Sequence, residues 1–224
     1  MVGAPTGPMD QMASLRARSG HLLFLDTRSL TVRQVPFDLA GWRLSLLVID
    51  TRASHELVGG EYAERRRSCA RAAELLRVPA LRDVRPEDLP RALNRIDDDV
   101  LRRRVRHVVT ENVRVLRVVE ALAGGSDPRA IGPVLTASHA SMRDDFEITV
   151  PAVDIAVEAA LAAGALGARM TGGGFGGSAI ALLPPENVDP LRARVEAAFA
   201  ARSWAAPHVF VVQPAPAAAR EDEG

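Results

Sequence analysis

Lysine is absent from this chain of 224 residues, in which all 28 basic side chains are arginine. A Walker A phosphate loop needs a lysine against the β- and γ-phosphates, and Schiff-base chemistry needs a lysine amine. The residues of this chain can build neither site. Cysteine is nearly absent as well, since Cys69 is the single one. An internal disulfide and a cysteine-rich zinc site are therefore excluded.

Net charge is zero and aromatic residues are scarce. The 28 basic side chains are balanced by 28 acidic ones, and 4% of the residues are aromatic. Proteins that coat nucleic acids need uncompensated cations, and single-strand binders need stacking surfaces. No apolar run has the length of a membrane span, and the start MVGAPTGPMDQ lacks the pattern of a signal peptide. We therefore expect no nucleic-acid partner, no membrane partner and a cytoplasmic location.

The chain has an ordinary globular composition, with 47% hydrophobic and 25% charged residues. Short apolar runs alternate with segments in which hydrophobic residues recur every three or four positions, so strands and helices are both expected. Strands near 44–50, 167–171, 177–183 and 208–213 predict a mostly antiparallel sheet with helices on one face, an α+β fold. Further strands are predicted at 21–26 and 31–37, and helices at 61–76, 98–123, 127–142, 151–163 and 188–202.

The clearest helix is predicted over residues 98–123, where an apolar stripe recurs at steps of three and four. Gly124 and Gly125 end it, and Asp127 and Pro128 are expected to cap and begin the next helix. The final residues, PAPAAAREDEG, are predicted to be disordered. The residues of the stripe are Leu101, Val105, Val108, Asn112, Val115, Val119 and Leu122.

The segment TGGGFGG, Thr171 to Gly177, contains five glycines in seven residues. Glycine permits positive φ and lets backbone N–H groups approach an anion without a Cβ in the way. The string also fits G-x-G-x-x-G, but a dinucleotide fingerprint needs a helix after the glycines, and a strand is predicted here instead. Two interpretations stay open at this point: a tight turn passed closely by another backbone, or an anion-binding loop.

Asp10 lies near the start of the chain, two residues after Pro8, which suits the first turn of a helix. A carboxylate there is stabilised by the helix macrodipole, which is a purely structural role. Alternatively, a carboxylate on a rigid helix start, close to Gly7, can accept a proton from a hydroxyl group and act as a general base. Neither role is decided by the local sequence.

Tyr62, the single tyrosine, lies close to a predicted helix start. Its hydroxyl group can cap a structural partner or hydrogen-bond a sugar. Further along this helix, Arg65, Arg66 and Arg67 are expected on its solvated side. The run Arg143-Asp144-Asp145 is expected to provide a cap and an ion pair.

Together these segments resemble the galactokinases of the GHMP small-molecule kinase superfamily, and the likeness runs in order through nearly the whole chain. The segment GAPTGPMDQMAS looks like the segment of that family that holds the catalytic aspartate. It is followed by GHLLFLDTRSL, HELVGGEYAERRRSCARAA, LRDV, SHASMRDDFEIT and RMTGGGFGGSAIAL. The last of these matches the third motif of the superfamily, and its combination with RDDFE is highly specific.

The resemblance implies transfer of the γ-phosphoryl group of ATP to the anomeric hydroxyl of galactose, with Mg²⁺ as the family's metal ion. It makes Asp10 the base that accepts the C1 hydroxyl proton, and it makes Gly7 and Tyr62 contacts of the sugar. It also implies a monomer with galactose and ATP as its small-molecule partners. The glycines that it places near the nucleotide phosphates are Gly172, Gly173, Gly174, Gly176 and Gly177.

The sequence departs from the family pattern at its start, where the sugar motif, the second glycine-rich motif and the acidic magnesium ligand are not found. We therefore expect a GHMP fold truncated at the N-terminus and inactive alone. Residues 1–40 would be a remnant of the N-terminal domain, 41–213 the C-terminal domain and 214–224 a disordered tail. The alternatives are a non-catalytic regulator that binds sugar or nucleotide, and a GHMP kinase for another sugar.

Overall fold

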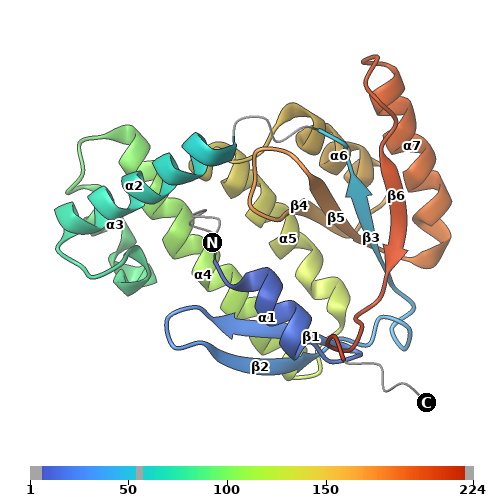
Figure 1. The fold of residues 1–224 in the computed structure, drawn as a ribbon, viewed down its shortest axis with the longest axis horizontal. Coiled ribbons are helices and arrows are strands. Elements are labelled where there is room, and N and C mark those ends of the chain that lie inside the picture. Colours follow the sequence, from blue (N-terminus) through green and yellow to red (C-terminus); the bar gives the residue numbers. More distant parts are fainter. Residues whose placement is uncertain (1–6, 54–57, 220–224) are drawn as a thin grey trace.

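A computed structural model describes residues 7–53 and 58–219 of the chain (Figure 1). The part of HELVGG that falls in residues 54–57 and the end of the chain, 220–224, lie outside the described residues. The helices are α1 (Met9–Arg16), α2 (Val58–Leu76), α3 (Leu89–Leu93), α4 (Asp99–Ala123), α5 (Gly132–Ser141), α6 (Pro151–Ala162) and α7 (Val188–Ala200). The strands are β1 (His21–Asp26), β2 (Thr31–Pro36), β3 (Ser45–Asp50), β4 (Gly167–Thr171), β5 (Ser178–Leu183) and β6 (His208–Val212).

Four of the strands form one antiparallel sheet in the order β4-β5-β3-β6. β3 is central, and its Leu47 lies opposite Ala181 on one side and Val211 on the other. The predicted α+β fold with an antiparallel sheet is therefore confirmed. β1 and β2 form a separate two-stranded antiparallel hairpin, in which His21 lies opposite Pro36.

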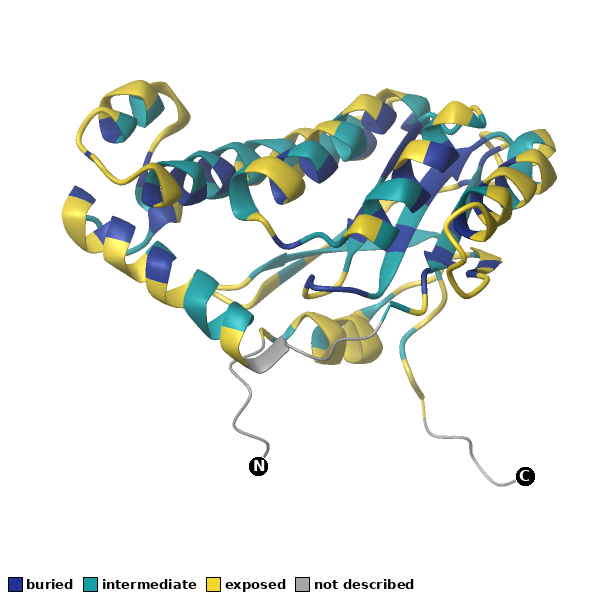
Figure 2. Ribbon diagram, turned by 90° about the horizontal axis from the view of Figure 1, so that it is seen from above, coloured by how far each residue is buried: buried dark blue, intermediate teal, exposed yellow. Residues whose placement is uncertain are grey.

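The two faces of the four-stranded sheet pack against different parts of the chain. Because successive strand residues point to opposite faces, Leu47 and Ala181 belong to one core and Leu46 and Leu182 to another. The first core is shared with α6 and α7, and the second with the end of α4 and the β1–β2 hairpin. Helices therefore pack on both faces of the sheet, and the prediction of helices on one face is wrong. A third core joins α2, α3 and α4. Figure 2 shows the buried residues along the sheet and along the inner sides of the helices.

α4 runs through the molecule, and successive parts of this helix pack against different elements. Its start is capped by Asp98, whose carboxylate accepts hydrogen bonds from the backbone N–H of Val100 at 2.8 Å and of Leu101 at 3.0 Å. The predicted stripe is wrong in its middle, where Val115 is 40% exposed. Polar residues of the neighbouring face, including Arg104 and His107, are buried there instead, because the middle of the helix packs against α5 and the turn that follows it.

The segment predicted as one helix over 127–142 is divided into a short turn and an α-helix, and a further turn continues it to Phe146. A short 3₁₀ turn, Pro128–Ile131, comes first, and the predicted cap is confirmed because Asp127 accepts a hydrogen bond from the Arg129 N–H at 2.9 Å. α5 follows, and a π-helical turn, Met142–Phe146, ends the segment. The other short 3₁₀ turns are Leu81–Asp83, Pro86–Asp88 and Pro185–Asn187.

Residues 214–219 return to the start of the chain. The Ala217 N–H donates to Ala17 O at 3.0 Å, and the Ala218 N–H donates to Ser14 O at 2.8 Å. These hydrogen bonds hold part of the segment for which the sequence predicts disorder. Among the described residues, no helix is long and apolar enough to cross a lipid bilayer.

Candidate active site

The glycine-rich loop, residues 172–177, connects β4 to β5 and has an unusual backbone. Gly174 has φ of +90°, and a Cβ on it would lie 2.8 Å from both the Cβ and the carbonyl oxygen of Ile148. Its neighbour Phe175 also has positive φ, at 60°. A side chain at position 174 would therefore be strained twice, by its own backbone and by a neighbouring one.

Three hydrogen bonds with two distant segments fix this loop at its middle and its end. The Phe175 N–H donates to Ile148 O at 2.7 Å. The buried Thr51, just after β3, donates to Gly177 O from its backbone N–H at 3.1 Å and from its hydroxyl group at 2.6 Å. The predicted close passage of another backbone is confirmed, and that backbone is the one at Ile148.

The first part of the loop is open. Nothing lies within 4 Å of a Cβ built on Gly172 or on Gly173. Among the described residues, the backbone N–H groups of Gly172, Gly173, Gly174 and Gly176 have no hydrogen-bond acceptor. Successive free N–H groups in a left-handed loop form a concave binding surface for an anion. The tight-turn and anion-binding interpretations are therefore compatible with each other in this loop.

Tyr62 and the glycine loop meet at one cavity of about 220 Å³. Tyr62 lies on α2 and Gly173 on the loop, and the walls between them are largely aromatic and aliphatic. Burial raises the pKa of the Cys69 thiol to about 11, so the thiol stays protonated and is a poor nucleophile. The residues that line the cavity are Tyr62, Arg65, Arg66, Cys69, Phe146, Ile148, Gly173 and Phe175.

Arg65 does not lie on a solvated side of its helix, and that prediction is wrong. Its side chain is 17% exposed, and its guanidinium group donates to Phe146 O at 2.7 Å and to Glu147 O at 3.0 Å. It also lies over the ring of Phe175, 5.7 Å from the ring centre. The spacing could have indicated this, because Tyr62, Arg65 and Cys69 recur at steps of three and four and so share one helix face.

The turn at residues 145–147 is also held from α4. Arg104, which is 1% exposed, donates to Asp145 O at 2.5 Å and to the Glu147 carboxylate at 2.6 Å. The Arg104 guanidinium holds the pKa of the Glu147 carboxyl below its ordinary value. The expected ion pair within Arg143-Asp144-Asp145 is confirmed at 2.8 Å between Arg143 and Asp144, whereas neither aspartate caps α6.

A half-buried polar network lies behind β4, next to the start of the glycine loop. Arg169 pairs with Glu111 of α4 at 3.2 Å, and Ser138 of α5 also donates to Glu111. Burial lowers the pKa of the Arg169 guanidinium. Burial by itself would raise the pKa of Glu111, but Ser138 and Arg169 hold it below its ordinary value. The carboxylate is therefore ionised and fixes the position of Arg169.

Asp10 lies in the first turn of α1, as predicted, with Pro8 at the N-cap. Gly7 and Asp10 are both exposed, and neither lines the cavity at Tyr62. In the described part of the chain, Asp10 has no hydrogen bond or ion pair through its side chain, so its carboxylate is accessible. α1 rests against β1 (Figure 1).

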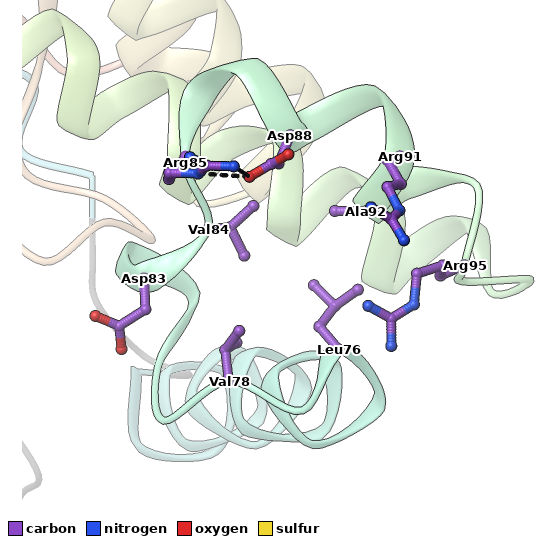
Figure 3. A pocket seen from close by; sticks show the side chains of 9 residues that line it. All are labelled: Leu76, Val78, Asp83, Val84, Arg85, Asp88, Arg91, Ala92 and Arg95. Carbon is purple, nitrogen blue, oxygen red and sulfur yellow. Dashed lines mark hydrogen bonds and ion pairs between the residues drawn. The ribbon is translucent and has the colours of Figure 1, made fainter.

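Two of the larger hollows among the described residues lie away from the glycine loop. One, of about 380 Å³, is lined by residues from the end of α2 to Arg95, and Figure 3 shows the Arg85–Asp88 ion pair at its rim. The other, of about 790 Å³, lies between β1, α2 and α4 and includes Leu116. Neither is lined by a glycine-loop residue. Within residues 7–53 and 58–219, no group of three or more His, Cys, Asp and Glu side chains could hold a metal ion.

Comparison with known proteins shows which families this chain resembles. Residues 118–201 match the family model of the C-terminal domain of GHMP kinases. A galactokinase of Streptomyces coelicolor is 56% identical over 220 residues, which are 98% of this chain and 57% of that protein. A galactokinase of Mycobacterium tuberculosis is 49% identical over 97% of this chain and 60% of that protein. The chain thus spans less than two thirds of the length of these relatives.

The same relationship is found in three dimensions. The crystal structure of Lactococcus lactis galactokinase complexed with galactose superposes with a TM-score of 0.88 at 31% identity, over 96% of this chain and 56% of that one. The resemblance recognised in RMTGGGFGG and RDDFE is therefore confirmed. Residues 118–201 match the model of the C-terminal domain of the GHMP kinases, and the chain is similar in sequence and fold, over nearly its whole length, to the galactokinases of that superfamily.

Proposed function

We propose that this chain carries part of the active site of a galactokinase, which transfers the γ-phosphoryl group of ATP to the C1 hydroxyl of galactose. The observation that carries the proposal is the match in sequence and fold to galactokinases over at least 96% of the chain. The open glycine loop and the cavity beside Tyr62 supply the kind of site that such a reaction needs. A monomeric protein working in the cytoplasm belongs to the same proposal.

The proposed roles follow from the chemistry of phosphoryl transfer, which depends mainly on positioning and on stabilising charge. The free N–H groups of the glycine loop would donate to phosphate oxygens. The accessible Asp10 carboxylate would accept the C1 hydroxyl proton as the sugar oxygen bonds to phosphorus and ADP leaves. Tyr62, together with Gly7, would hydrogen-bond or contact the sugar. Glycines 172, 173, 174, 176 and 177 make up the phosphate-facing loop.

Mg²⁺ would neutralise phosphate charge when bound with ATP. The described residues offer no group of three ligating side chains for it. ATP would be a substrate, and its phosphates would be met by backbone N–H groups.

The test compares the 224-residue chain with a chimera in which it replaces the matching 57% of the Streptomyces coelicolor galactokinase. We expect the chimera to form galactose 1-phosphate from galactose and ATP, and the chain alone to form little or none. Asp10→Asn should lower kcat of the chimera by about 10²-fold or more, because proton acceptance contributes about 10²–10⁴. Asp189→Asn, at an exposed carboxylate of α7, is the control.

A folded chimera that binds ATP and galactose without any turnover would contradict the kinase proposal and favour a binding regulator. Turnover that Asp10→Asn leaves unchanged would contradict the role of Asp10 while keeping the activity. Preference for another sugar under the same conditions would contradict galactose as the substrate.

A further inference from the structure

We propose that Arg65 is a positioning residue that holds the glycine loop and the Tyr62 helix at a fixed separation through the turn at residues 145–148. The proposal rests on the proposed function only where it assigns phosphates to the loop. The mechanical part depends on hydrogen bonds within this chain alone.

The first step is that three successive carbonyl groups of the turn accept hydrogen bonds from guanidinium groups. Asp145 O accepts from Arg104 at 2.5 Å, Phe146 O accepts from Arg65 at 2.7 Å, and Glu147 O accepts from Arg65 at 3.0 Å. Carbonyls at the end of a helical turn lack intrahelical partners, and cations are favourable there. Glu147 has φ of 55°, so the backbone at this turn is strained and depends on these contacts.

The second step is that the next carbonyl of the same segment is bonded to the glycine loop. Ile148 O accepts from the Phe175 N–H at 2.7 Å, and Ile148 packs where Gly174 has no side chain. Four consecutive carbonyls, 145–148, are therefore shared between two arginines and the loop. A displacement of this segment would carry the loop backbone with it, because the contact at Gly174 leaves no free space.

The third step connects the turn to Tyr62. Arg65 follows Tyr62 by one turn of α2, and both line the cavity of about 220 Å³. The Arg65 guanidinium also lies over the Phe175 ring at 5.7 Å. The planar guanidinium group of Arg65 thus contacts both the turn and the loop. The helix that carries Arg65, α2, also carries Tyr62. Lysine could not reproduce this, because its ammonium group is a compact point charge without the planar fork.

The experiment uses the whole chain without ligand and measures amide hydrogen exchange of a peptide that covers residues 172–177. The Phe175 N–H is the loop amide held by Ile148 O, and Arg65→Ala should raise its exchange about 10- to 100-fold, since the charged-donor hydrogen bonds that hold the 145–148 segment are lost. Exchange in β3 should stay unchanged. Arg67→Ala is the matched control, at an exposed arginine two residues away on the same helix, and it should change neither segment.

Two further measurements separate positioning from general stability. Arg65→Lys keeps the charge and the fold, and it should leave exchange in the loop raised, whereas a role of charge alone predicts full recovery. Added methylguanidinium should restore slow exchange in Arg65→Ala but not in Gly174→Ala, in which the guanidinium is already present. Wild-type exchange in the loop of Arg65→Ala, or an equal rise in the loop and β3, would overturn the proposal.

ATP affinity, measured by calorimetry on the same proteins, connects the loop to phosphate. If the wild-type chain binds ATP, Arg65→Ala should weaken the affinity about tenfold or more, and Arg67→Ala should not. Absence of ATP binding by every protein would count against the proposed function, while the exchange result would still decide the positioning role. ATP affinity that is unaltered in Arg65→Ala, with the loop freed, would overturn the link to phosphate.

Discussion

The glycine loop and the turn of the β1–β2 hairpin both connect neighbouring antiparallel strands, but they are held in different ways. The glycine loop is fixed by backbone hydrogen bonds at Phe175 and Gly177, next to buried residues. The β1–β2 turn is fixed by bidentate ion pairs from the segment after α2. Arg28 pairs with Asp83 at 2.8 Å, and Arg82 pairs with Asp26 at 2.8 Å.

The difference lies in exposure to water. The four side chains of the hairpin ion pairs are 27–52% exposed, and every residue of β1 is only half-buried. The glycine loop instead lies over a turn that is held by Arg104 at 1% exposure. Exposed ion pairs contribute little because water and salt screen them, whereas a buried guanidinium is costly to remove. We therefore expect the turn beneath the glycine loop to be held more firmly than the β1–β2 turn.

The largest effect should come from Arg104→Ala, which removes the buried guanidinium group that holds the turn beneath the glycine loop. Asp145 O and the Glu147 carboxylate would lose their partner, and a cavity would remain. We expect the free energy of unfolding to fall by roughly 3 to 5 kcal/mol in urea titrations. Arg117→Ala, at an exposed arginine of the same helix, should change it by less than about 0.5 kcal/mol. Equal effects of the two variants would break the comparison.

The next largest effect is expected in the pH dependence of stability, through the buried side chain of His107. Burial lowers the pKa of His107 from its ordinary 6.5 to about 4, and the ring stacks on Phe146. The unfolded chain therefore binds a proton more readily, so stability is full above pH 6.5 and falls as the pH drops toward 4. The loss should be on the order of 3 kcal/mol. His107→Gln should remove this part of the pH profile, and His208→Gln, at an exposed position, should not.

Within the glycine loop itself, two adjacent alanine substitutions should differ. Gly174→Ala places a Cβ 2.8 Å from Ile148 at φ of +90°, and it should cost roughly 2 to 3 kcal/mol. Gly173→Ala meets nothing within 4 Å and should cost less than about 1 kcal/mol. Thermal unfolding of both variants measures the contrast. A similar loss in each would mean that the contact with Ile148 does not restrict the loop.

The smallest effect is expected in the hairpin. Hydrogen bonds from Arg28 lower the pKa of Asp83, so this ion pair stabilises the fold above the ordinary carboxyl pKa and is lost as the pH falls through the lowered value. A double-mutant cycle of Arg28→Gln and Asp83→Asn should give a smaller coupling than the effects of Arg104→Ala, of His107 protonation and of Gly174→Ala. The coupling should shrink further in 1 M salt, whose screening length is about 3 Å. A coupling that salt leaves unaltered would contradict an exposed pair.

Several features of the fold were accessible from sequence because they are local. Apolar runs predicted all four strands of the main sheet, and periodicity predicted α4 within two residues. Asp127 and Pro128 predicted a cap. Residue type alone indicates Tyr62 and the glycine loop as candidate site residues. The structure brings Tyr62 and Gly173 to one cavity. The roles of Asp10 and Gly7 remain predictions that the proposed activity measurements will decide.

Other features depended on contacts between distant segments. Helical spacing places Arg65 and Arg67 on different faces of α2, but only the packing of α2 against the 145–147 turn shows which face is buried. Likewise, Val115 fits the helical stripe of α4, but no described element covers it, while Arg104 and His107 are buried by α5 and the turn after it. Periodicity identifies a helix, but it does not say what each part of a long helix will meet.

The α+β elements, the need for glycine at a strained loop and the likeness to galactokinases all follow from the amino-acid sequence alone. These depend on steric and periodic properties that each segment carries alone. Only the tertiary structure decided that the carbonyls of residues 145–148 are divided between Arg65, Arg104 and Phe175. A carbonyl accepts from any donor brought near it, so its partner is fixed only when α2, α4 and the β4–β5 loop pack together.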